Sequence, residues 1–145
     1  MTALIFGFDR LAVQVRLHDF TGGDSCLPAD ISLGAGRQRY SMLLNSDRVD
    51  DIMVANLGFH LLVIVNAATK LQDEAILGAR LGNTCWVETL VDHALIAIQR
   101  RLAEAVLAPH VSEVVDMKFI DVKAVSVVGP TGIVLRSGYT GRSQV

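Results

Sequence analysis

The longest amphipathic pattern in the chain lies over residues 84–108, where apolar side chains recur every three or four positions. Asn83 or Thr84 can cap the start of a helix there, and Pro109 would end it. The pattern therefore predicts one long amphipathic helix of roughly six to seven turns, with the rest of the chain packed around it. Its apolar stripe consists of Val87, Leu90, Val91, Ala94, Leu95, Ile98, Leu102 and Ala105.

Alternation of apolar and polar residues predicts strands elsewhere in the chain. The stretch 11–17 alternates, and Gly7 leaves open either a hairpin or one long bulged strand over 4–17. The apolar run 59–65 predicts a central strand buried on both faces. Shorter patterns predict a strand at 40–44 and helices at 48–56 and 67–81, with caps and glycine stops at their ends.

After Pro109 the period changes from that of a helix to that of a strand. Residues 111–119 alternate, so we expect a strand that covers the helix stripe near Leu95, Ile98 and Leu102 and buries Phe119 against it. Residues 122–128 and 133–139 flank a Gly-Pro-Thr-Gly turn, which predicts a C-terminal β-hairpin.

Together these elements predict an α+β fold, with an antiparallel sheet, the helix over 84–108 packed on one face, and the C-terminal hairpin. We expect one domain over residues 1–140 and a flexible tail over 141–145. Residues 19–39 form a Gly-rich loop without clear periodicity, and such long loops are usually functional or ordered by a partner.

Composition points to contacts with other protein subunits. The chain is 51% hydrophobic with a mean hydropathy of +0.42, more apolar surface than one small domain hides. We therefore expect a homo- or hetero-oligomer. A net charge of −2 offers no basic field for nucleic acid. The longest apolar run, 57–68, is too short to span a membrane, and the N-terminus does not resemble a signal peptide, so we expect a cytoplasmic protein.

No motif predicts catalysis, a metal or a cofactor. Gly23-Asp24-Ser25-Cys26-Leu27 resembles the nucleophile block of the GDSL esterases, with Cys26 inserted before the leucine. That family's Asp-x-x-His has no counterpart near this C-terminus, and a serine needs such a base. We interpret the string as a polar turn. The spacing of the four histidines and two cysteines fits no zinc site, and we predict no small-molecule ligand.

Five residues are candidates for a contact surface between subunits: Ile96, Arg100, Arg101, Arg37 and Arg39. Ile96 lies within the polar arc of the predicted helix, and Arg101 lies at the edge of its apolar stripe. Either Arg101 extends along the stripe to reach water, or the two residues mark a second packed surface. Arg37 and Arg39 follow two glycines; this stretch matches no phosphate-binding motif, and we interpret it as a flexible loop with a basic end.

The C-terminal text LAEAVLAPHVSEVVDMKFIDVKAVSVVGPTGIVLRSGY resembles the end of phage baseplate wedge proteins of the lysozyme-like wedge family. In those proteins a helix precedes strands of similar alternation. The resemblance covers about residues 90–139, and the family's Arg-Pro-Gly-Glu-Arg loop is absent. It implies a non-enzymatic subunit of a phage tail or a related contractile particle.

The sequence therefore favours an assembly subunit, most concretely a bacteriophage tail or baseplate component, that is not an enzyme. The alternative is a small oligomeric enzyme or ligand-binding protein with its site at a subunit interface. In that case the site would draw on Asp9, Arg10, His18, His60 or Arg101 from different chains.

Overall fold

The computed structural model describes residues 2–6, 12–16, 33–45, 48–58, 60–83, 85–91, 93–127 and 131–137. These residues form two antiparallel sheets, two α-helices and one 3-10 helix. The five-stranded sheet has the order β3 (Arg37–Asn45), β4 (Arg48–Asn56), β5 (Leu61–Ile64), β2 (Ala12–Arg16) and β6 (Trp86–Leu90). The four-stranded sheet has the order β7 (Ala94–Ile98), β1 (Thr2–Phe6), β9 (Thr131–Arg136) and β8 (Val122–Ser126).

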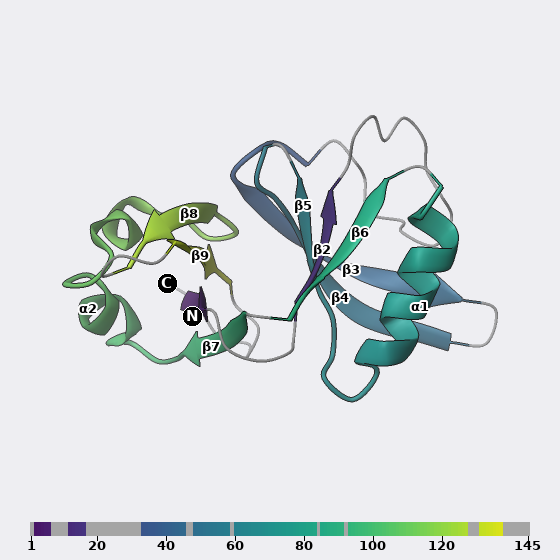
Figure 1. Ribbon diagram of the computed structural model, residues 1–145. Coiled ribbons are helices and arrows are strands. Elements are labelled where there is room, and N and C mark those ends of the chain that lie inside the picture. Colours follow the sequence, from purple (N-terminus) through teal and green to yellow (C-terminus); the bar gives the residue numbers. More distant parts are fainter. Residues whose placement is uncertain are drawn as a thin grey trace.

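The described elements stack in four layers, with the two sheets in the middle and a helical layer at each end (Figure 1). Helix α1 (Lys70–Leu81) covers one face of the five-stranded sheet, where Leu77 and Leu81 pack into a buried cluster with Val63. Helix α2 (Ala103–Leu107) and the 3-10 helix η1 (Ser112–Asp116) cover the outer face of the four-stranded sheet.

The inner faces of the two sheets share a third apolar cluster. From the five-stranded sheet come Met53, Ala55, Leu62, Ile64 and Leu90, and from the four-stranded sheet come Val122 and Leu135. The sheets also join through the backbone at one corner. There Gln38 N–H donates to Ile120 O over 2.9 Å, and Val122 N–H donates to Gly36 O over 2.9 Å. Gly36 has a φ of 79°, a conformation that glycine adopts without strain.

The predicted helix over 84–108 is wrong. The structure has two strands, β6 and β7, and only then the five-residue helix α2. Strand β6 pairs with β2, and β7 pairs with β1. This stretch is rich in Val, Thr, Ile and Leu, and its apolar residues fit a two-residue period locally as well as a helical one. Pairing with the N-terminal strands decides between the two patterns.

Three shorter predictions are also wrong. Residues 48–56 are strand β4 rather than a helix, and 111–119 contain η1 rather than a strand. Strands β1 and β2 lie in different sheets, so they form neither a hairpin nor one long strand. Leu102 is 71% exposed and Phe119 is 56% exposed, so neither lies in the core expected for them. For 48–56 the pairing with β3 and β5 overrides the local pattern.

The coarser architecture is confirmed: the fold is α+β with antiparallel sheets. The helix expected at 67–81 is α1, and the buried strand at 59–65 is β5, which lies between β4 and β2. Strands β8 and β9 pair as the C-terminal hairpin. Within the described ranges, no helix is long and apolar enough to cross a membrane. The single domain over 1–140 stays a prediction, and the tail over 141–145 lies outside the described residues.

Candidate functional site

The inner face of the five-stranded sheet is only partly covered by the other sheet. In β3 and β4, residues that face each other share a side of the sheet: Gln38 with Ala55, Tyr40 with Met53, and Met42 with Asp51. Gln38 and Ala55 are buried, whereas Met42 and Asp51 are exposed. The inner face therefore opens to solvent toward the end of β3 and the start of β4.

We call the residues at this opening, Tyr40, Met42, Asp51 and Met53, the Asp51 corner. Tyr40 is 41% exposed and Met42 is 46% exposed, while Met53 is buried at the edge of the shared cluster. In the part of the chain that the structure describes, no hydrogen bond or ion pair engages the Asp51 carboxylate. A carboxylate beside partly exposed apolar side chains can accept hydrogen bonds from a ligand, so we take the Asp51 corner as the candidate site.

Asp50, the neighbour of Asp51, points to the opposite face of β4, the side that α1 covers. Its carboxylate accepts a hydrogen bond of 2.6 Å from Asn66 Nδ2. The same Nδ2 atom donates to Asp51 O over 3.2 Å. Two adjacent carboxylates therefore have different surroundings: Asp50 is held within the protein, and Asp51 faces the open corner.

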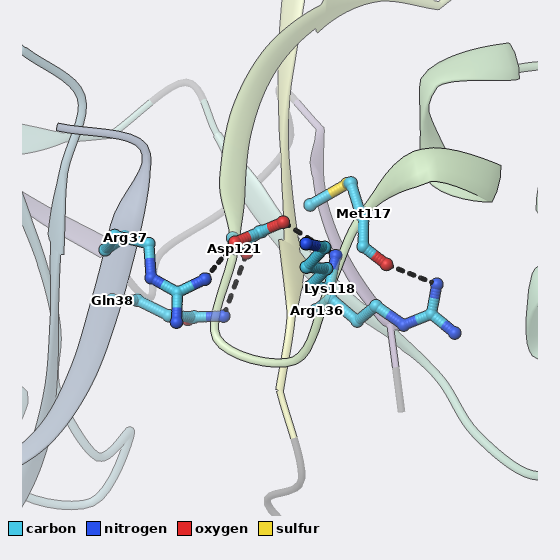
Figure 2. A network of polar contacts seen from close by, with 6 residues as sticks. All are labelled: Arg37, Gln38, Met117, Lys118, Asp121 and Arg136. Atoms are coloured by element: carbon cyan, nitrogen blue, oxygen red, sulfur yellow. Dashed lines mark hydrogen bonds and ion pairs between the residues drawn. The ribbon is translucent and has the colours of Figure 1, made fainter.

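A second polar cluster lies where the two sheets join (Figure 2). The Asp121 carboxylate forms an ion pair with Arg37 and accepts a hydrogen bond of 2.6 Å from the Lys118 backbone N–H. Gln38 Nε2 donates to Asp121 O over 3.2 Å. Partial burial alone would raise the pKa of Asp121, but the Lys118 N–H and the Arg37 guanidinium outweigh it, so the pKa lies below its ordinary value.

Arg136 extends this cluster to the outer helical layer. Its Nη1 atom donates to Val114 O over 3.1 Å and to Met117 O over 2.9 Å, the second of which Figure 2 shows. Its Nη2 atom forms an ion pair of 2.6 Å with Glu104 of α2. The charged groups of this cluster are occupied by contacts inside the protein. We therefore interpret it as structural and the Asp51 corner as the candidate site.

The five residues predicted for subunit contacts do not converge on one site. Arg37 and Arg39 lie on the same face of β3, and Arg37 is engaged by Asp121. Ile96 lies on β7 and is partly exposed, and Arg100 and Arg101 are exposed in the turn before α2. Arg100 has a φ of 85°. Their role in contacts between subunits stays a prediction.

Of the alternative interface residues, His60 is buried just before β5 and Arg101 is exposed. Asp9, Arg10, His18 and the turn with Ser25 and Cys26 lie outside the described residues. Asp51 was not among the predicted site residues, because residues 48–56 were predicted to form a helix. The available signal was the continuous apolar run 52–55, which is typical of a strand buried on both faces. In such a strand the adjacent residues Asp50 and Asp51 point to opposite faces.

Residues 24–144 match the family model of the GCVT N-terminal domain. The chain is 29% identical to a mitochondrial aminomethyltransferase of Dictyostelium discoideum, over 88% of this chain and 36% of that protein. It is 34% identical to an aminomethyltransferase of Saccharopolyspora erythraea, over 81% of this chain and 34% of that protein. The crystal structure of glycine cleavage system aminomethyltransferase T from Bartonella henselae matches with a TM-score of 0.55 and 26% identity, over 92% of this chain and 39% of that one.

These comparisons correct the functional interpretation. The resemblance to phage wedge proteins is wrong, because the matching family covers most of the chain. It also relied on a helix before the strands that the structure replaces with β6 and β7. The phage assembly subunit and the absence of enzymatic activity are contradicted as well, because the relatives are aminomethyltransferases. The findings favour the alternative, an enzyme. The chain spans about a third of the length of the curated relatives it matches.

Proposed function

The chain belongs to the family of the GCVT N-terminal domain, and on that premise we propose that it forms part of an aminomethyltransferase of a glycine cleavage system. The names of the relatives support this activity. In that enzyme, this chain would hold the group that is transferred.

The observation that carries the proposal is the Asp51 carboxylate on a partly open, apolar sheet face. An aminomethyl group carries a basic nitrogen that is positive when protonated. A carboxylate accepts hydrogen bonds from such a nitrogen, and charge-assisted bonds of this kind are about twice as strong as neutral ones. Met42 faces Asp51 across the strand pair, and Tyr40 lies on the same face of β3 two residues away, so both side chains are available to pack on the apolar part of the ligand. Asp51 would bind and orient the amine.

We also propose that the protein works with other protein subunits, as its apolar composition predicts. The name of the Bartonella relative places that protein in a glycine cleavage system. A cytoplasmic location remains part of the proposal, although one relative is named as mitochondrial. The prediction of no nucleic-acid partner came from the net charge of −2. The predictions of no cofactor and no small-molecule ligand came from the absence of motifs, and the second of these two is replaced by an amine-bearing substrate.

The test is a chimera in which residues 24–144 replace the matching segment of the Saccharopolyspora enzyme. We expect the chimera to support consumption of glycine by the other proteins of the cleavage system. Asp51→Asn should lower that rate about 100-fold, because losing one partner of a close charge pair costs about 2–5 kcal/mol. Asp116→Asn, at an exposed position of η1, is the matched control and should leave the rate unchanged.

Two outcomes would contradict the proposal. A folded chimera without activity would show that this segment does not serve the reaction. An active chimera whose rate is the same with Asp51→Asn would show that the amine is held elsewhere. Circular dichroism of each variant separates loss of activity from loss of fold.

A further inference from the structure

Strand β5 is shorter than its neighbour β4, and Asp51 lies in the part of β4 that β5 does not reach. The ladder between the two strands begins at Met53, which faces Ile64, and ends at Asn56, which faces Leu61. Asp50 and Asp51 lie in β4 beyond the end of β5. On that side the ladder does not hold their backbone, although β3 still pairs with them on the other side.

Asn66 occupies the position where the ladder has ended. Its Nδ2 atom has two hydrogens, and it donates to Asp50 Oδ1 over 2.6 Å and to Asp51 O over 3.2 Å. Asp50 and Asp51 point to opposite faces of the strand. One side-chain amide thus holds the carboxylate of the first residue and the carbonyl of the second, which restricts rotation of the backbone that carries the Asp51 side chain.

Asn66 is in turn connected to the start of α1. The Thr69 backbone N–H donates to Asn66 O over 3.2 Å. The Thr69 hydroxyl donates to Asp73 Oδ2 over 2.8 Å, and Asp73 is fully buried in the first turn of the helix. A continuous set of hydrogen bonds therefore runs from a buried helical carboxylate, through Thr69 and Asn66, to the backbone at Asp51.

We propose that Asn66 is a positioning residue for Asp51, which sets the direction of that carboxylate toward the open corner without touching the substrate itself. The inference rests on the proposed function, in which Asp51 holds the amine. A neutral amide suits this role, because it donates two hydrogen bonds and adds no charge beside the two carboxylates. Positioning of this kind matters for rate, since a displacement of about 1 Å can cost about 100-fold.

The first test uses NMR on the full 145-residue chain. Three-bond couplings to the Asp51 carboxyl carbon report the χ1 angle. We expect a single staggered rotamer in the wild type and averaged couplings in Asn66→Ala. Asn56→Ala is the matched control, because Asn56 lies at the other end of β4 and bonds Leu33 O and Gly58 N. Unchanged Asp51 couplings in folded Asn66→Ala would overturn the proposal, as would equal averaging in the control. Asn66→Ser serves if the alanine variant does not fold.

The second test uses the chimeric enzyme. Asn66→Ala should lower kcat about 10- to 100-fold, and the double variant with Asp51→Asn should be no slower than Asp51→Asn alone, because both changes remove the same oriented carboxylate. If Asp51→Asn slows the enzyme and the Asn66 effect multiplies with it, Asn66 acts independently and the positioning role is wrong. If Asp51→Asn has no effect, the proposed function is what fails, and the couplings of the first test still decide whether Asn66 orients Asp51.

Discussion

Two aspartates of this molecule, Asp121 and Asp51, have opposite surroundings. Asp121 lies where the sheets join and has its carboxylate engaged by Arg37 and the Lys118 N–H. Asp51 lies at the open end of the inner sheet face, beside exposed Tyr40 and Met42. Both residues carry the same chemical group, and only the second is oriented toward solvent with apolar neighbours.

This difference separates a structural role from a binding role. A charge whose partners are all inside the protein contributes to the fold, and a ligand could reach it only by displacing those partners. A carboxylate on a partly exposed apolar surface keeps its capacity to accept hydrogen bonds from a ligand. Changes at the junction of the sheets should therefore affect stability, and changes at the Asp51 corner should affect activity.

The largest effect on stability is expected from the apolar side of the junction. Leu135 is fully buried in the cluster that joins the two sheets, so Leu135→Ala should lower the free energy of unfolding by about 2–5 kcal/mol. Met42→Ala, in the Asp51 corner, should change it by no more than about 0.5 kcal/mol. Urea denaturation of both variants measures the difference. Equal losses would show that the two regions do not differ as described.

A smaller loss of stability is expected from the polar side of the junction. Asp121→Ala leaves the Lys118 N–H and the Arg37 guanidinium without their carboxylate, which should cost about 1–3 kcal/mol. Asp116→Ala is the control, because Asp116 is exposed in η1. In the chimeric enzyme, Asp121→Ala should lower the denaturation midpoint while kcat at a temperature where the protein is folded stays near wild type. A loss of kcat without a loss of stability would reverse the assigned roles.

The contribution of Asp121 should also depend on pH in a defined direction. Its pKa in the folded protein is lower than the ordinary value of 3.8, so the unfolded chain binds the proton more tightly. The stabilisation is therefore complete above the unfolded pKa and is lost as the pH falls through the folded pKa. The difference in unfolding free energy between wild type and Asp121→Ala should be constant above about pH 5 and shrink below pH 3.8. A difference that grows on acidification would contradict the assigned ion pair.

Helix α1 and strand β5 could be predicted from the sequence, because their own residues are sufficient to determine their structure. Helix α1 has a polar start, buried Leu77 and Leu81, and a glycine after its end, and the apolar run of β5 marks a central strand. The stretch 84–108 could not be predicted in this way, because its structure depends on pairing with β1 and β2, whose partners are as distant in sequence as Arg16 from Trp86 and Thr2 from Ile98.

The candidate site was harder to predict than the fold. The assignment of Asp51 to the candidate site depends on Met42, which faces it across the sheet, and on the position where β5 ends. Neither relation is visible in the sequence once 48–56 is assigned to a helix. The link from Asn66 to Asp50 spans 16 residues and forms only because β4 and β5 are paired. Side-chain chemistry was available from the sequence, whereas the convergence of these side chains required the register of the sheet.

The smallest effect is expected where the sequence predicted a large one. Leu102 was assigned to the buried stripe of a long helix, but it directly precedes α2 and is largely exposed. Leu102→Ser should therefore change the free energy of unfolding by no more than about 0.5 kcal/mol. Leu107→Ser, at the buried end of the same helix, should cost several times more, because Leu107 packs against Val111 and Val134. Thermal and urea denaturation of the two variants gives the comparison directly. A loss at Leu102 as large as the loss at Leu107 would mean that another surface covers Leu102 in solution, and light scattering of the wild-type chain would then have to show an assembly larger than the monomer.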